Sequence, residues 1–168
     1  MAKMTRDLFR PYLSINQTGD APQWLRIDKS TQFEFSWNPS TEEKGYITDK
    51  NDATEVSGYA PELPEELALD TSSPLFTPLH DFLWQFNVGQ DAQVPFLLVL
   101  PDASGEPKVG YMWASATLTG DTLNSVDGVL SFTIAPNGDP VKGTVEYKGD
   151  VPSFTAATAS ASTERAKK

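Results

Sequence analysis

The run of residues 74–88, PLFTPLHDFLWQFNV, constrains the fold more than any other stretch of the chain. Its apolar side chains recur at the spacing of one helical face. They are Leu75, Phe76, Leu79, Phe82, Leu83 and Phe86. Ser72 or Ser73 is suited to cap the first turn, and Gly89 follows where a helix of this length should stop. We therefore expect a helix over about 73–88 that buries this stripe.

Two prolines bear on where this helix begins. Pro74 suits the first helical position, because the amide hydrogen that proline lacks would have no partner there. Pro78 removes a hydrogen bond, so either the first turn is irregular or the helix begins at Thr77 with Pro78 as its first residue. No other substantial helix is expected, and strand-like segments lie on both sides. The sequence thus predicts one buried helix laid across a β-structure.

The N-terminal half contains two short segments in which apolar and polar residues alternate. They are residues 23–29 and 33–37, and the short polar connection between them predicts an antiparallel hairpin. Residues 1–19 carry apolar anchors, but Pro11 interrupts any helix, so we expect an irregular N-terminal arm.

The second half of the chain contains further strand candidates. Residues 94–100, VPFLLVL, form a continuous apolar run, which is typical of a strand buried on both faces. Residues 108–119 alternate loosely, and 129–134 alternate cleanly with Leu130, Phe132 and Ile134 on one face. A strong turn signal precedes a last strand over 141–148. The fold class is therefore mainly β, antiparallel, with one flanking helix.

Residues 38–53 contain almost no apolar side chain besides Tyr46 and Ile47. This composition predicts either a plain surface loop or a binding loop that becomes ordered against a partner. Residues 155–168 have little apolar bulk, and we expect a disordered tail. The expected domain therefore spans 20–154, with the polar loop inside it.

The chain has 168 residues, enough for one domain with a real core and too few for two comfortable ones. Its net charge is −10, and the acidity is concentrated in residues 39–91, which hold eleven acidic and two basic side chains. Such a surface repels phosphate backbones, so specific nucleic-acid binding is not expected. A solvated acidic face is the plainer interpretation.

The chain has no cysteine, which favours synthesis in a reducing cytoplasm and excludes thiol chemistry. The N-terminus lacks the apolar region of a signal peptide, and no apolar run reaches the length of a membrane span. We therefore expect a soluble protein that is not secreted by the usual route.

Few residues point to catalysis. His80 is the only histidine, and we expect it on the helix surface rather than at a metal or in a catalytic triad. Neighbouring carboxylates such as Glu65 and Glu66 point to opposite faces of a strand and cannot share a site. The four tryptophans, Trp24, Trp37, Trp84 and Trp113, are expected in the core. We expect no enzymatic activity and no cofactor.

Residues 49–91 resemble the major tail proteins that build the tail tube of long-tailed bacteriophages. The resemblance lies in an acidic loop, a T-E-V-x-x-Y-x-P segment, an extended stretch and a helix that opens with proline and an aromatic residue. The matching residues are Thr54, Glu55, Val56, Tyr59, Pro61, Pro74, Phe76, Phe82 and Leu83. The segment WLRIDKSTQFEFSWNP also fits, and the resemblance covers roughly residues 8–150.

The resemblance implies a β-sandwich or flattened barrel that forms hexameric rings with itself. These rings stack into the tail tube of a virion, through which the genome DNA passes without specific binding. It also implies tape measure and tail terminator or tip proteins as partners, synthesis in the host cytoplasm and no membrane. An acidic inner wall would let a polyanion move without adhering. A plain tube surface would follow from the absence of an extra C-terminal domain.

The polar loop is the expected contact between subunits or rings. The residues assigned to this contact are Glu42, Glu43, Lys44, Tyr46, Ile47, Asp49 and Lys50. Two other functions stay open. A stand-alone β-sandwich binding module for carbohydrate or peptide would use the aromatic residues and the polar loop, and an acid hydrolase would use carboxylates brought together by the fold.

Overall fold

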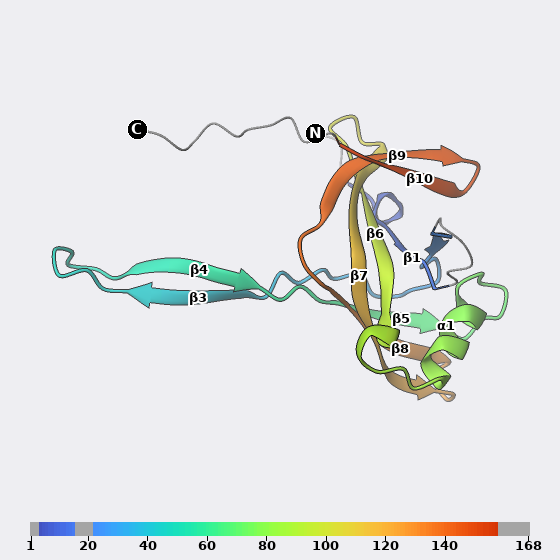
Figure 1. The fold of residues 1–168 in the computed structure, drawn as a ribbon. Coiled ribbons are helices and arrows are strands. Elements are labelled where there is room, and N and C mark those ends of the chain that lie inside the picture. The colour runs from blue at the N-terminus through green and yellow to red at the C-terminus, as the bar shows by residue number, and fades with distance from the viewer. Residues whose placement is uncertain (1–3, 16–21, 158–168) are drawn as a thin grey trace.

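The computed structural model describes residues 4–15 and 22–157 (Figure 1). The helical elements are η1 (Arg6–Leu8), α1 (Phe76–Trp84) and η2 (Gly89–Ala92). The strands are β1 (Arg10–Leu13), β2 (Leu25–Arg26), β3 (Pro39–Lys44), β4 (Ala53–Tyr59), β5 (Leu63–Ala68), β6 (Gln93–Pro101), β7 (Pro107–Asn124), β8 (Val129–Pro136), β9 (Val141–Lys148) and β10 (Val151–Ala156).

Eight of these strands form one curled antiparallel sheet, the body of the molecule. Six follow the order β10-β9-β7-β6-β1-β2, while β8 joins through β7 and β5 joins through β8. The remaining two, β3 and β4, form a separate sheet that projects from the body (Figure 1). The prediction of a mainly β, barrel-like fold with one flanking helix is confirmed.

Strand β6 lies in the interior of the sheet and is buried on both faces. Phe96 and Leu98 belong to the main core, whereas Leu97 and Val99 belong to a smaller cluster. All four side chains are at most 5% exposed. The prediction that residues 94–100 form a strand buried on both faces is therefore confirmed. The predicted inward face of β8 is confirmed as well, because its alternate apolar residues are buried in the main core.

The long strand β7 connects two parts of the sheet. Its residues 109–112 pair with β9, and its residues 116–124 pair with β8 across an irregularity between Gly120 and Thr122. A Cβ at Gly120 would lie 3.2 Å from the side chain of Leu83 on α1. Glycine at this position therefore leaves room for the helix to pack against the strand.

The helix is shorter than the predicted range of 73–88. It begins at Phe76, so Pro78 falls within the first turn, where a missing amide hydrogen breaks no helical hydrogen bond. Neither Ser72 nor Ser73 caps it, and the Ser73 hydroxyl instead donates to Asp28 Oδ1 at 2.7 Å. No helix among the described residues is long and apolar enough to cross a membrane.

The predicted apolar stripe is correct except at its C-terminal end. Leu75 and Leu79 are fully buried, and the remaining stripe residues up to Leu83 pack partly against the core. Phe86 is 75% exposed, because the helix ends at Trp84 and the backbone at Phe86 turns left-handed, with φ +51°. The stripe pattern could not show where the helix would stop.

The predicted N-terminal hairpin is wrong. Of residues 23–29 only Leu25 and Arg26 form a strand, and that strand pairs with β1. Residues 33–37 form no strand, and single bridges join Ser30 to Leu67 in β5 and Ser36 to Glu62 just before it. The alternation correctly indicated half-buried extended chain, but it does not specify the partner.

Both predicted ends of the domain also differ from the structure. Residues 1–19 were predicted to be irregular, but they contribute β1. This strand lies between β2 and β6, with Tyr12 and Leu13 buried. At the other end β10 extends to Ala156, into the predicted tail of 155–168, and residues 158–168 lie outside the described residues. A sequence with so few apolar residues carries little strand signal, and β10 is ordered by pairing with β9.

Candidate assembly surface

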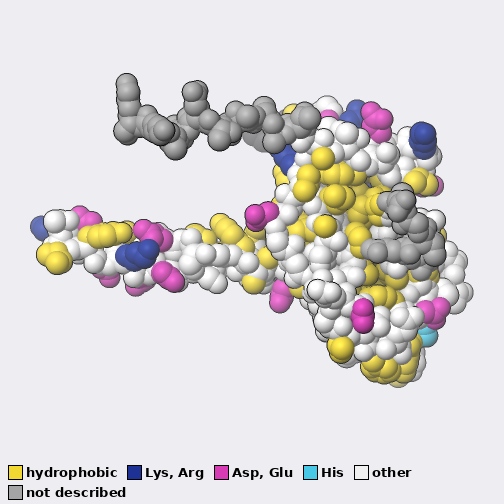
Figure 2. All heavy atoms as spheres, viewed as in Figure 1, with side chains coloured by type: hydrophobic (Ala, Val, Ile, Leu, Met, Phe, Trp, Pro, Cys, Tyr) yellow, Lys and Arg dark blue, Asp and Glu magenta, His cyan; other side chains and the backbone are white. Residues whose placement is uncertain are grey.

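Residues 39–59 form a hairpin that we call the arm. Its strands pair from Pro39 with Tyr59 to Lys44 with Ala53, with a bulge between Ser40 and Thr41. Every residue of β3 is exposed, and the arm extends from the body as a narrow ribbon (Figure 2). The prediction of a loop over 38–53 is therefore wrong, because this range contains a complete strand and the turn that follows it.

Hydrogen bonding holds the arm together. The Ser57 hydroxyl donates to the carbonyl oxygen of Ser40 at 3.0 Å, and Lys44 pairs with Glu55 at 2.5 Å. At the root, the Asn38 amide donates to the carbonyl oxygen of Ala60 at 3.1 Å. A two-stranded hairpin alone is only marginally stable in water, so contact with another surface would stabilise the arm.

All seven predicted contact residues lie on this hairpin. Glu42, Glu43 and Lys44 belong to β3, and the other four lie in the turn between the strands, the arm tip. Tyr46 is 52% exposed and Ile47 is 106% exposed, and the carbonyl oxygen of Tyr46 accepts a hydrogen bond from the amide of Asp49. The fold thus places two apolar side chains at the point farthest from the body.

A second feature lies at the arm root, where a groove of about 840 Å³ opens between the arm and the body. We call it the aromatic groove, after the seven aromatic residues that line it. They are Phe9, Phe33, Phe35, Trp37, Tyr59, Tyr111 and Trp113. Trp113 is 5% exposed, whereas Trp37 and Tyr59 are 65% and 63% exposed. Among the described residues, Asp139 is the only charged side chain that lines the groove.

The tryptophan prediction is correct only in part. Trp113 belongs to the main core, and Trp24 packs partly against the smaller cluster. Trp37 lies in the aromatic groove, and Trp84 is 57% exposed at the end of α1. Both exposed indoles make edge-to-face contacts with other aromatic rings, with ring centroids 5.4 Å apart for Trp37 and Phe35 and 5.9 Å apart for Trp84 and Phe86.

His80 lies on the helix surface, as predicted. Its ring stacks on Phe76, and its Nε2 accepts a hydrogen bond from Trp84 Nε1 at 2.9 Å. Within the described ranges, no group of three histidine, aspartate or glutamate side chains is arranged to hold a metal ion. The contacts with Phe76 and Trp84 give the histidine a role in local packing.

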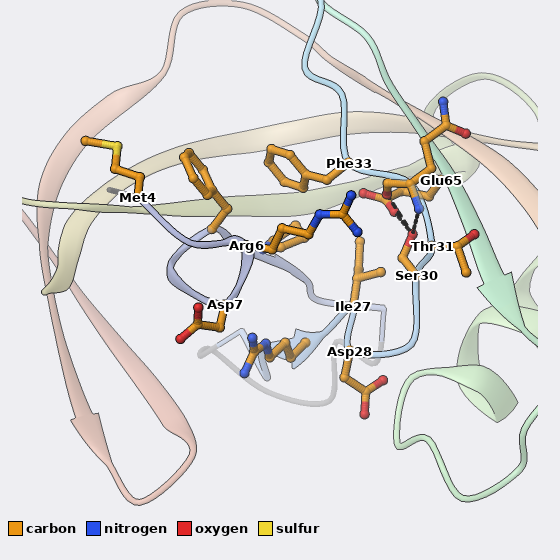
Figure 3. A pocket seen from close by; sticks show the side chains of 13 residues that line it. Met4, Arg6, Asp7, Ile27, Asp28, Ser30, Thr31, Phe33 and Glu65 are labelled. Carbon is orange, nitrogen blue, oxygen red and sulfur yellow. Dashed lines mark hydrogen bonds between the residues drawn. The ribbon is translucent and has the colours of Figure 1, made fainter. Parts of the chain in front are cut away.

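A smaller pocket of about 580 Å³ contains the carboxyl group of Glu65 (Figure 3). This side chain is 1% exposed and accepts a hydrogen bond from the Ser30 hydroxyl, while its Oε1 has no partner among the described residues. Burial raises the pKa of Glu65 to about 7, and the Ser30 hydrogen bond opposes this only partly. The sequence analysis missed this buried carboxylate, although its place between Leu63 and Leu67 on one face of a strand is the signal that could have identified it.

The Glu65 pocket lacks the arrangement that the hydrolase hypothesis requires. Asp7 and Asp28 also line it, but Figure 3 shows their carboxylates pointing away from Glu65. A glycosidase-type mechanism uses two carboxylates that face one substrate bond. The pocket offers a single buried carboxyl group instead.

The fold resembles chains in assembled injection machines. One match is a chain in the sheath/tube terminator of an extracellular contractile injection system in its extended state, with a TM-score of 0.53 and 12% identity. It covers 84% of this chain and 97% of that one. A chain in the tube-terminating cap of the anti-feeding prophage also matches, with a TM-score of 0.53 and 12% identity. The match covers 86% of this chain and 93% of that one.

The comparisons by sequence find no relative. No model of a protein family matches the chain, and no curated protein matches it. At 12% identity, the two structural matches show a shared fold that extends over nearly the whole length of each partner.

Proposed function

We propose that this chain is a structural subunit of a tail-tube-like assembly and has no enzymatic activity. The observation that carries the proposal is a projecting arm with no core of its own, attached to a curled sheet whose end strands are open. The fold is shared with chains of a tube terminator and a tube cap, whose similarity supports the same type of role.

The open sheet supports association of copies side by side. β10 and β2 form the two ends of the strand order, so each presents backbone groups on one side that pair with no strand of the described chain. Such edges are a liability in an isolated protein and are removed when neighbouring copies pair them. A closed hexameric ring would give both of these end strands a partner. Tape measure and terminator or tip proteins would bind the ends of the stack.

The arm supports association along the axis of the stack. It carries Glu42, Glu43, Lys44, Tyr46, Ile47, Asp49 and Lys50, the residues proposed for contact between rings. A hairpin that is only marginally stable alone opens in part in the free subunit, and fixing each opened residue costs about 1–2 kcal/mol, which disfavours the contact between free subunits. Many simultaneous contacts around a ring would overcome this cost once a template ring exists.

The charge of the chain supports the passage of DNA through such a tube. A lumen wall that carries part of the net charge of −10 would repel phosphates, so a genome could move through it without specific binding. Replacing lumen carboxylates by lysine should leave assembly intact and slow genome ejection.

Electron microscopy of the purified protein over a concentration series tests this proposal. Rings and tubes should form at high concentration, and amide exchange in the arm should slow on assembly. The matched variant replaces residues 41–57 by Asn-Gly, a two-residue turn suited to joining the paired residues Ser40 and Gly58. It should remain a folded protein that forms no long tubes. A wild-type protein that stays monomeric at every concentration would contradict the proposal.

A binding module for carbohydrate or peptide is the second candidate function, and the aromatic groove favours it. Exposed aromatic rings such as Trp37 and Tyr59 are suited to stack on a sugar or pack against a peptide. Glycan-array and peptide-array binding by a monomeric protein would support this function over self-assembly.

A further inference from the structure

We propose that the aromatic groove of one copy receives the arm tip of a second copy, with Tyr46 and Ile47 as the side chains that enter the groove. This inference rests on the proposed self-assembly and names the surface that the arm contacts. It makes the contact head-to-tail, because the tip and the groove lie at opposite ends of the same arm.

The tip has the chemistry of an inserted segment. Ile47 is 106% exposed and Tyr46 is 52% exposed, in a turn whose other residues are mostly polar or charged. Exposed apolar side chains at the end of a thin hairpin gain free energy when another surface removes them from water. Their position lets them enter a groove without the body of the second copy approaching closely.

The groove has the complementary chemistry. Its floor includes Leu98 and Trp113, both 5% exposed, while Trp37 and Tyr59 provide exposed aromatic walls. A volume of about 840 Å³ is in the range of pockets that hold small ligands, which is sufficient for two side chains. An aromatic surface of this kind is typical of the buried centre of a protein interface.

The groove carries little charge. Asp139 is the only charged side chain lining the groove in the described part of the chain. At the tip, Asp49 and Asp52 lie on either side of Lys50, so both signs of charge lie near Tyr46 and Ile47. The contact therefore rests on the apolar side chains of the tip and on the aromatic lining of the groove.

The geometry makes this contact intermolecular. A strand rises about 3.3 Å per residue, so the tip lies roughly 30 Å from the arm root and cannot reach its own groove. Each copy therefore offers one tip and one groove to other copies. Tip and groove that engage two different neighbours generate an open stack, whereas two copies that insert reciprocally would form a closed dimer and a single crosslinked dimer band. The arm length predicts an axial repeat on the order of 30 Å.

Cysteine crosslinking tests the contact directly, because the natural chain has no cysteine. The variant Ile47→Cys/Asp139→Cys places one thiol at the tip and one at the groove. Oxidation after assembly should give a ladder of covalent oligomers in denaturing electrophoresis. The control Ile47→Cys/Asp150→Cys keeps the tip thiol and moves the second thiol to the exposed β9–β10 turn. The control should give no ladder above background.

A second measurement does not depend on thiol geometry. Ile47→Ser should raise the protein concentration needed for tube formation about tenfold or more, because an apolar side chain no longer becomes buried. Val126→Ser is the matched control, since Val126 is 93% exposed in the β7–β8 turn and lies in neither the tip nor the groove. It should leave that concentration unchanged.

The outcomes separate this contact from the proposed function. A ladder specific to the tip and groove pair, together with the Ile47→Ser effect, supports the contact. Wild-type tubes with no specific ladder and no effect of Ile47→Ser overturn the contact and leave the tube function standing. If the wild-type protein forms no tubes and the cysteine pair gives no ladder, both are overturned.

Discussion

The arm and the central strands of the body are both antiparallel β-structure, yet they are stabilised in different ways. β6 has side chains buried on both faces, in two separate apolar clusters. β3 has every residue exposed, and the arm is held by backbone pairing, one ion pair and a few side-chain hydrogen bonds. The body buries its two apolar clusters without a partner, whereas the arm gains most of its possible contacts from a neighbour.

This difference shows that a hydrophobic pattern indicates the burial of side chains and not the pairing of backbones. Alternation or a continuous apolar run indicates which faces of a strand are buried. A strand with solvent on both faces has no such pattern, although its backbone hydrogen bonds are the same. The sequence of residues 38–53 therefore predicted a polar loop. The following predictions test the contrast between arm and body.

The largest expected difference comes from removing an apolar side chain. Phe132→Ala should lower the free energy of unfolding by about 3–5 kcal/mol, because Phe132 is fully buried and its loss leaves a cavity. Val56→Ala in the arm should change it by less than about 0.5 kcal/mol, because Val56 is 53% exposed. Urea unfolding followed by tryptophan fluorescence measures both. Equal effects would show that the arm takes part in the cooperative unit of the body.

The next prediction concerns the pH dependence of stability. Burial raises the pKa of Glu65 to about 7 in the folded protein, from an ordinary value of 4.5. Between these values the folded state binds more protons than the unfolded state, so this group makes stability fall as pH rises. Glu65→Gln should remove up to about 3 kcal/mol of this fall.

Unfolding curves of wild type and Glu65→Gln at pH 4 and pH 8 measure the effect. The variant should gain stability relative to wild type at pH 8 and not at pH 4. Glu43→Gln is the control in the arm, where the carboxylate is exposed, and it should give no such difference between the two pH values. A constant difference between Glu65→Gln and wild type would contradict the assignment.

Two glycines, one in the body and one in the arm, give the third comparison. A Cβ at Gly143 would lie 2.2 Å from the carbonyl oxygen of Thr155 on β10, so Gly143→Ala should cost about 1–3 kcal/mol through displacement of that strand. At Gly58 in the arm, a Cβ would meet no atom within 4 Å. Gly58→Ala should be neutral or slightly stabilising. Thermal unfolding compares the two variants. An unchanged unfolding midpoint for Gly143→Ala would show that β10 can shift without a measurable loss of stability.

The smallest expected effect is in the arm alone. Lys44 and Glu55 form an ion pair whose side chains are each 48% exposed, and such pairs contribute about 0.2–1 kcal/mol. Lys44→Ala should leave the unfolding midpoint unchanged and speed amide exchange in β3 and β4 about twofold. Exchange faster by orders of magnitude would mean that this pair is essential for the hairpin to form.

Hydrophobic patterns were sufficient to predict those helices and strands whose side chains are buried on one face or on both. The helix stripe from Leu75 to Leu83, the inward face of β8 and the buried run of β6 were all predictable, because each has a distinct hydrophobic period. The arm residues were singled out by composition as a contact surface, although their hairpin structure was not recognised. Glu65 was missed because residues 63–68 were not predicted to form a strand, although Leu63, Glu65 and Leu67 alternate onto the same buried face of β5.

The sequence by itself determined the class of the fold, the presence of one helix and most of its core-facing side chains. Only the tertiary structure decided which strands pair, where the helix ends and that residues 38–53 belong to a hairpin standing out from the body. The physical reason is that side-chain burial is recorded locally in the order of residues. Backbone pairing is available to every residue, and its partner is selected by segments far away in the chain.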